Sequence, residues 1–128
     1  MFGSFQNRIK ELMVIGAPTP VVGMGVTITM YSDRHAGTIF HITKKGEATT
    51  IIVRRDMVKR IDNTGISESQ QYEYTSDVNG YPYYFKQKRA NSLWQQYTMN
   101  RDTGRLNKVK GGNGLYVGDR EEYYDFSF

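Results

Sequence analysis

Alternation of apolar and polar residues with a period of two is the feature that most restricts the fold of this chain. The segments with this pattern are GVTITMY (25–31), AGTIFHIT (36–43), TTIIVRRDM (49–57), QYEYTS (71–76), YPYYFKQK (81–88), LWQQYTMN (93–100) and EYYDFSF (122–128). They are rich in β-branched and aromatic residues, which is typical of half-buried β-strands. We therefore predict a mainly β fold.

Turn residues separate these strands. Lys44-Lys45-Gly46-Glu47 lies between the second and third strands. Asp77-Val78-Asn79-Gly80 predicts a hairpin between 71–76 and 81–88, because an Asn-Gly pair readily adopts positive φ. Short strands joined in this way favour an antiparallel order. We predict a small antiparallel β-barrel or rolled sheet of six to eight short strands.

One short helix is expected before the strands. Phe5, Ile9 and Leu12 recur at helical spacing, and Pro18 and Pro20 end the pattern. A length of 128 residues suits a single domain, 1–128. We divide it into a helix and Pro-containing linker (1–20), a β core (21–100), a Gly-rich loop (101–119) with one short strand around 115–117, and a C-terminal strand (120–128).

Composition excludes several classes of protein. The chain has no cysteine, which removes disulfide scaffolds, thiolate metal sites and cysteine nucleophiles. No run approaches the roughly 20 apolar residues of a membrane span, and residues 1–10 lack the order of a secretion signal. We expect a soluble, cytoplasmic protein with no membrane partner.

Basic and acidic residues are unevenly distributed. Of 17 Lys and Arg and 13 Asp and Glu in the chain, residues 1–110 hold 16 and 9. The rest of the chain is acidic, with Arg120 as its one basic residue. A basic body favours an anionic partner, namely nucleic acid, nucleotide or phosphate, while the acidic end disfavours a wholly basic nucleic-acid surface. A solvated surface of mixed sign is the alternative.

Two resemblances bear on the fold and the origin. Val22 to Asp56 has the order glycine turn, strand, polar loop, Gly-Thr-Ile strand, Lys-Gly turn and strand, and this resembles the start of Tudor-type or KOW-type small barrels. The combination of SDRHAGTI, RRD, SESQQYEY and GDREEYYDFSF is similar to a group of small tailed-phage and prophage proteins. The second resemblance implies a phage origin, and with it the cytoplasm of a bacterial host, but no activity.

The first candidate site is Ser32-Asp33-Arg34-His35, which interrupts the alternating pattern. Ser and Asp suit a solvated turn, but a turn does not require a guanidinium beside an imidazole. Arg34 offers fixed donors for phosphate, His35 can donate or accept near neutral pH, and Asp33 could orient Arg34. We predict that these residues contact an anionic ligand.

The second candidate site is VRRDMVKRID (53–62), where Arg54 and Asp56 share one side of a strand. These residues fit a phosphate-binding edge, and ion pairing on a solvated face is the alternative. Arg55 lies on the side of Val53, so it would be partly buried. It would then need a partner such as Glu68 or Glu73.

The third candidate site is SESQQYEY (67–74). Tyrosines can stack on bases, and Gln or Glu side chains can read base edges, so Glu68, Gln70 and Tyr72 are predicted ligand contacts. Packing within a small β core is the alternative for the aromatic residues. Arg120 completes the predicted set.

Catalysis is not expected. His35 and His41 would lie about 20 Å apart in one straight strand, which is too far for joint metal coordination. Ser32, Asp33 and His35 lie in one loop rather than converging from separate elements, and GGNGLYVG (111–118) lacks the Gly-Lys-Ser/Thr ending of a phosphate-binding loop. We predict no catalytic residues, no metal and no cofactor.

Two classes of function remain. The first is a phage-type, non-enzymatic binder of a phosphorylated nucleotide or other small anionic ligand, which would sequester a host immune signalling nucleotide. The second is a nucleic-acid-binding or protein-adaptor module of Tudor or KOW type. Exposed aromatic residues and an amphipathic N-terminal helix also agree with a homo-oligomer.

Overall fold

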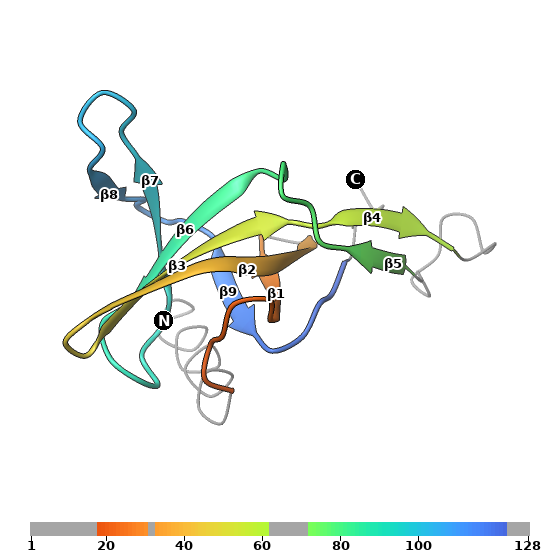
Figure 1. Ribbon diagram of the computed structural model, residues 1–128, viewed down its shortest axis with the longest axis horizontal. Helices are drawn as coiled ribbons and strands as arrows, with labels where there is room; N and C mark the ends of the chain where they lie inside the picture. The colour runs from red at the N-terminus through yellow and green to blue at the C-terminus, as the bar shows by residue number, and fades with distance from the viewer. Residues whose placement is uncertain (1–17, 31–32, 62–71, 123–128) are drawn as a thin grey trace.

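The computed structural model describes residues 18–30, 33–61 and 72–122, and every regular element within them is a β-strand (Figure 1). The strands are β1 (Gly25–Thr29), β2 (Arg34–Lys45), β3 (Ala48–Arg55), β4 (Met57–Arg60), β5 (Tyr72–Thr75), β6 (Pro82–Gln87), β7 (Gln95–Met99), β8 (Leu106–Lys108) and β9 (Gly114–Val117). All of their pairings are antiparallel. The predicted mainly β, antiparallel fold is confirmed. The described residues contain no helix long and apolar enough to cross a lipid bilayer.

Seven strands form one open sheet in the order β8-β7-β6-β3-β2-β1-β9, and β4 pairs with β5 in a separate sheet of two strands. The prediction of a closed barrel is wrong, because β8 and β9 are sheet edges that do not pair with each other. A barrel needs strands of matched tilt and stagger around the whole circumference. Here β7 and β8 instead form a hairpin that projects from the sheet (Figure 1).

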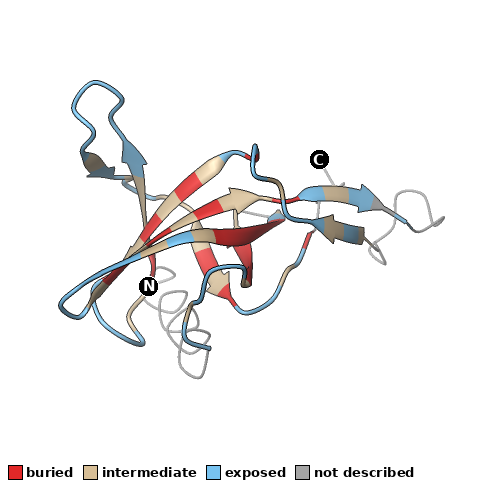
Figure 2. Ribbon diagram, viewed as in Figure 1, coloured by how far each residue is buried: buried red, intermediate tan, exposed pale blue. Residues whose placement is uncertain are grey.

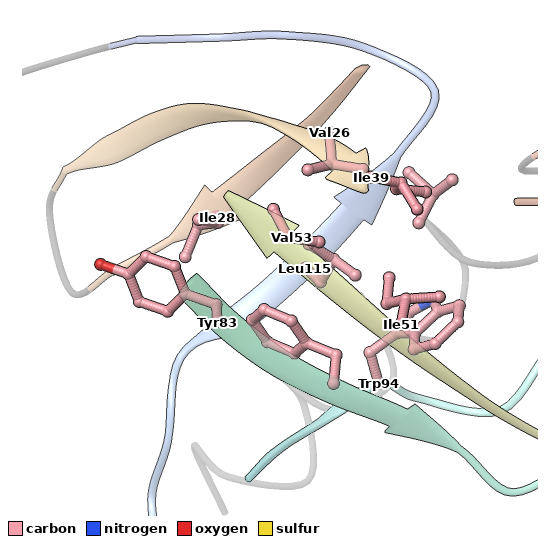
Figure 3. Close-up of a cluster of buried hydrophobic side chains, with 10 residues drawn as sticks. Val26, Ile28, Ile39, Ile51, Val53, Tyr83, Trp94 and Leu115 are labelled. Atoms are coloured by element: carbon pink, nitrogen blue, oxygen red, sulfur yellow. The ribbon is translucent and has the colours of Figure 1, made fainter. Parts of the chain in front are cut away.

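The buried residues are concentrated in the strands of the large sheet, and the projecting β7–β8 hairpin is largely exposed (Figure 2). Burial alternates along β3 and β6, so that every second side chain points into the core. The core residues are Val26, Ile28, Ile39, Ile51, Val53, Tyr83, Phe85, Trp94, Leu115 and Val117. Strands near both ends of the sheet contribute to this one cluster. Figure 3 shows the sheet curling, so that β9 crosses β3 with core side chains between them.

Two glycines allow β2 and β3 to turn and to lie close together. Gly46 has φ of 63° in the tight turn between β2 and β3, a conformation that favours glycine. At Gly37 in β2, a Cβ would lie 2.8 Å from Val53 Cγ1 and 3.0 Å from the Arg54 carbonyl oxygen. The close approach of β2 to β3 therefore depends on the absence of a side chain at position 37.

The predicted hairpin between 71–76 and 81–88 is wrong. Its two strands exist as β5 and β6, but β5 pairs with β4, and β6 pairs with β3 and β7. Neither Asn79 nor Gly80 has positive φ. The Asp77 carboxylate accepts the Asn79 N–H at 2.9 Å, and the Asp77 carbonyl accepts the Gly80 N–H at 2.9 Å. This turn carries the chain from one sheet to the other.

Two further predictions need correction. The strand predicted at 49–57 breaks at Asp56, where β3 leaves the large sheet and β4 begins. The Gly-rich stretch 101–119 contains β8 as well as β9, so the strand expected around 115–117 is confirmed and β8 was missed. The N-terminal helix predicted before Pro18 and residues 123–128 of the predicted C-terminal strand lie outside the described residues, and residues 120–122 are not in a strand.

Candidate functional site

The chain that follows β9 returns across the end of β1 and β2. The Gly118 N–H donates to the Gly25 carbonyl at 2.9 Å, and the Thr27 hydroxyl donates to the Asp119 carbonyl at 2.8 Å. These bonds hold residues 119–122, named here the crossing segment, against the sheet. The crossing segment carries four of the chain's ionisable residues to the end of β2, where Arg34 and His35 lie.

Glu122 inserts a fully buried carboxylate into this end of the sheet. Its Oε2 lies 2.9 Å from His35 Nδ1 and 3.6 Å from Arg55 Nη2, and its Oε1 accepts the Ala36 N–H at 2.9 Å. The exposed fraction of its side chain is 0%. Arg55 Nη2 also lies 2.8 Å from His35 Nδ1, so Nδ1 either accepts from Arg55 or donates to Glu122, depending on the tautomer. Burial is compensated because each carboxylate oxygen has a partner.

Tyr74 joins the two-stranded sheet to the crossing segment. The Glu122 backbone N–H donates to the Tyr74 hydroxyl oxygen at 3.2 Å. Burial raises the pKa of the Tyr74 phenol above 10.0, and the negative charges of Glu122 and Glu121 raise it further. The phenol therefore stays neutral at physiological pH. The β4–β5 arm is thus fixed to the same point as β2 and β3.

Asp56 organises a second buried group beside the first. Its Oδ1 accepts the Thr38 hydroxyl at 2.7 Å, and its Oδ2 accepts Arg120 Nε at 2.9 Å. Arg120 Nη2 also donates to the Thr38 hydroxyl oxygen at 2.9 Å. The Asp56 backbone N–H donates to the Ala36 carbonyl, which fixes the point where β3 ends. Gly25 leaves room for Arg120, because a Cβ there would lie 2.7 Å from Arg120 Cγ.

The remaining predicted contacts are more scattered. Arg34 makes an exposed ion pair with Glu121, 2.5 Å between Nη1 and Oε1. The carbonyl of Asp33 accepts the Met30 N–H in the β1–β2 connection. Arg54 is the direct cross-strand partner of Thr38, donates to the Gly80 carbonyl at 3.0 Å and lies 6.0 Å from the centre of the Phe40 ring.

Tyr72 lies on the β4–β5 arm, with its ring 6.5 Å from that of Tyr74. Glu68 and Gln70 lie outside the described residues. The structure therefore brings together Arg34, His35, Asp56 and Arg120 at the crossing segment. Arg54 lies beside Thr38 but donates to the Gly80 carbonyl, and Tyr72 lies on the β4–β5 arm.

Sequence reasoning missed the acidic half of the cluster. No role was predicted for Glu121 or Glu122. In the structure Glu121 pairs with exposed Arg34, and the Glu122 carboxylate is buried. The partial burial of Arg55 was the signal that a buried carboxylate is needed. Glu122 meets that need from a distant part of the sequence.

Charges in this cluster are balanced. Arg34 faces Glu121, Arg55 faces Glu122, and Arg120 faces Asp56, while His35 is buried. The cluster joins distant elements and offers no excess positive charge to an anionic ligand. No protein-family model, curated protein or solved structure matches the chain. The resemblance to phage proteins and to Tudor or KOW barrels therefore stays a prediction.

A second surface has a different chemistry. It is formed by the side chains of β2, β3, β6, β7 and β8 that point away from the core, and we name it the outer face. Tyr84, Tyr97 and Lys108 are direct cross-strand partners on β6, β7 and β8. Lys86 Nζ lies 4.8 Å from the centre of the Tyr97 ring. These five strands contain no Asp or Glu.

The projecting β7–β8 hairpin extends this basic surface. Its connection is exposed (Figure 2). Arg101 and Arg105 lie in this connection and are exposed, with Asp102 as the acidic residue between them. The tyrosines, lysines and arginines together make the outer face an aromatic and cationic surface.

No residue in the described part of the chain belongs to a group of three or more His, Asp or Glu that could hold a metal ion.

Proposed function

We propose that this protein binds single-stranded nucleic acid on its outer face. The observation that carries the proposal is the neighbouring pair Tyr84 and Tyr97, flanked by Lys86 and Lys108, on strands without acidic residues. Half-exposed tyrosines on the surface of a sheet can each stack on a base. Lys108 beside Tyr97 and Lys86 over one face of the Tyr97 ring can neutralise phosphates of the same strand, while the other face of that ring can stack on a base.

A single strand fits this surface better than a duplex. Bases stack on aromatic rings only when their faces are free, and in a duplex those faces are covered by neighbouring base pairs. The outer face is a sheet surface on which Tyr84 and Tyr97 lie side by side. Arg101 and Arg105 of the projecting hairpin extend the cationic path beyond the tyrosines.

Sequestration of a phosphorylated nucleotide, the other function expected from the sequence, remains a prediction. It needs a site other than Arg34, His35 and Arg120, since these residues are engaged by carboxylates of the chain itself. The absence of catalysis and the formation of a homo-oligomer also remain predictions. Sedimentation of the purified protein tests the oligomer directly.

The test is fluorescence anisotropy with a labelled oligonucleotide at several salt concentrations. Stacking contributes about 1–3 kcal/mol per base, so Tyr97→Ala should weaken binding by about tenfold or more. Lys108→Ala should reduce the slope of log affinity against log salt by about 0.7, the value for one phosphate contact on a single strand. Duplex of the same sequence should bind more weakly.

Lys44→Ala is the matched control, because Lys44 is also an exposed lysine but its cross-strand partner Thr49 points toward the core. It should leave both the affinity and the salt slope nearly unchanged. The proposal fails if no saturable binding occurs at low salt. It also fails if Tyr97→Ala binds as tightly as the unmodified protein.

A further inference from the structure

The concave side of the sheet can be followed along β3, away from the Glu122 cluster, to the opposite end of that strand. At Arg55, β3 meets the Glu122 cluster, and at the other end of β3, near Thr49, a cavity of about 480 Å³ opens. Figure 3 shows the same two ends in the core, with Tyr83 beside Ile28 and Trp94 beside Ile51. The cavity is therefore the open mouth of the curled sheet, away from the outer face.

The walls of this cavity combine apolar and polar groups. Trp94 and Val117 are core residues that also line it, and Pro18 adds a third apolar surface. Thr49 and Gln87 are direct cross-strand partners that are each 8% exposed. The Gln87 amide is held in place, because its Nε2 donates to the Ser92 carbonyl at 2.9 Å.

Charge is found only at the rim of the cavity. Lys44 and Arg89 are exposed cations there, with Glu47 as the acidic residue. Neither cation belongs to an ion pair within the described chain. Arg89 is placed by a turn in which the Ser92 N–H donates to the Arg89 carbonyl at 3.1 Å and Asn91 adopts φ of 65°.

We infer that this cavity binds a small molecule with a flat apolar body and one anionic group. Ligand sites are commonly about 300–1,000 Å³ and combine apolar walls with a few fixed polar groups. The body would lie against Trp94 and Val117, with Thr49 and Gln87 within reach of its polar edges. The anionic group would lie at Lys44 and Arg89. A nucleoside monophosphate has this chemistry and is the test ligand.

Trp94 makes the inference directly measurable. It is the single tryptophan of the chain and it lines the cavity, so intrinsic fluorescence of the intact protein reports on this site. Titration with a nucleoside monophosphate should change the Trp94 emission to saturation and raise Tm. The corresponding nucleoside, which lacks the phosphate, should bind about tenfold more weakly, because hydrogen bonds to a charged group are lost.

Variants separate this site from the outer face. Lys44→Ala and Arg89→Ala should each weaken the titration by about tenfold, while Lys108→Ala should not change it. Oligonucleotide binding should instead be weakened by Lys108→Ala and unchanged by Lys44→Ala. The two proposals can therefore fail independently. The inference is overturned if nucleoside monophosphates and inorganic phosphate leave both emission and Tm unchanged. Equal binding of nucleoside and nucleotide overturns the assignment of the anionic group to Lys44 and Arg89.

Discussion

Replacement of Glu122 by alanine should be among the most destabilising single changes in this protein. The carboxylate is fully buried and is the partner of His35, Arg55 and the Ala36 N–H. Removal of one member of a buried ion pair typically costs about 3–5 kcal/mol, because the other charge is left without compensation. The Ala36 N–H would also lose its acceptor, and we include the cost of that unpaired donor in the same range.

This loss can be converted to a melting temperature. For a chain of 128 residues, 1 kcal/mol corresponds to roughly 4 °C in Tm, so Glu122→Ala should lower Tm by about 12–20 °C. The assay is thermal unfolding followed by circular dichroism near 215 nm, with urea unfolding as a second measure of the free energy. A variant that is unfolded at room temperature would exceed the expected effect and agree with its direction.

Glu121→Ala is the matched control, since it removes the same group one residue earlier. Its partner Arg34 and its own carboxylate are 50% and 52% exposed, and such pairs contribute about 0–1 kcal/mol. Tm should therefore fall by no more than about 4 °C. If the two variants lose equal stability, the crossing segment is not held by the buried Glu122 carboxylate, and the reasoning is refuted.

Two further predictions concern the same end of the sheet. Burial raises the pKa of the Tyr83 phenol above 10.0, so the folded protein favours the neutral phenol. The stability that follows is fully present below the pKa of the unfolded chain and is lost as the pH rises through the pKa of the folded protein. Tyr83→Phe should therefore show a smaller loss of Tm above about pH 10 than the unmodified protein, and an unchanged alkaline transition would contradict this. Gly80→Ala should lose about 3 kcal/mol or more, since a Cβ there would lie 2.1 Å from the Arg55 carbonyl oxygen. Its neighbour Asn79 is exposed, so Asn79→Ala should stay within about 0.5 kcal/mol, and urea unfolding of both variants compares them.

Local pattern was sufficient to predict most strands, because burial on one face imposes the period of two on the sequence itself. The segments that became β1, β3, β6 and β7 all show it. Strand pairing was harder to predict. Asn79-Gly80 indicated a hairpin, but the geometry of the turn is set by Asp77 and by contact with Arg55, which no local rule contains.

The candidate site shows the same limit. Arg34 and His35 were singled out because a turn does not require them, Asp56 because it shares one side of a strand with Arg54, and Arg120 was added to complete the set. Their convergence could not be predicted, since it depends on where β9 and the crossing segment pack. Charge pattern alone also could not distinguish an arginine that faces solvent from one neutralised by a carboxylate 64 to 87 residues away.

The crossing segment also has a consequence for biosynthesis. β1 and β2 leave the ribosome long before the residues that complete them, because Thr27 pairs with Asp119 across 92 positions and Ala36 with Glu122 across 86. Until β9 and the crossing segment emerge, nascent β1 has an unpaired edge and Val26 and Ile28 lack part of their cover. Such exposed strand edges invite aggregation. Nascent chains arrested before Gly114 should therefore depend on chaperones, whereas released full-length chains can complete the fold.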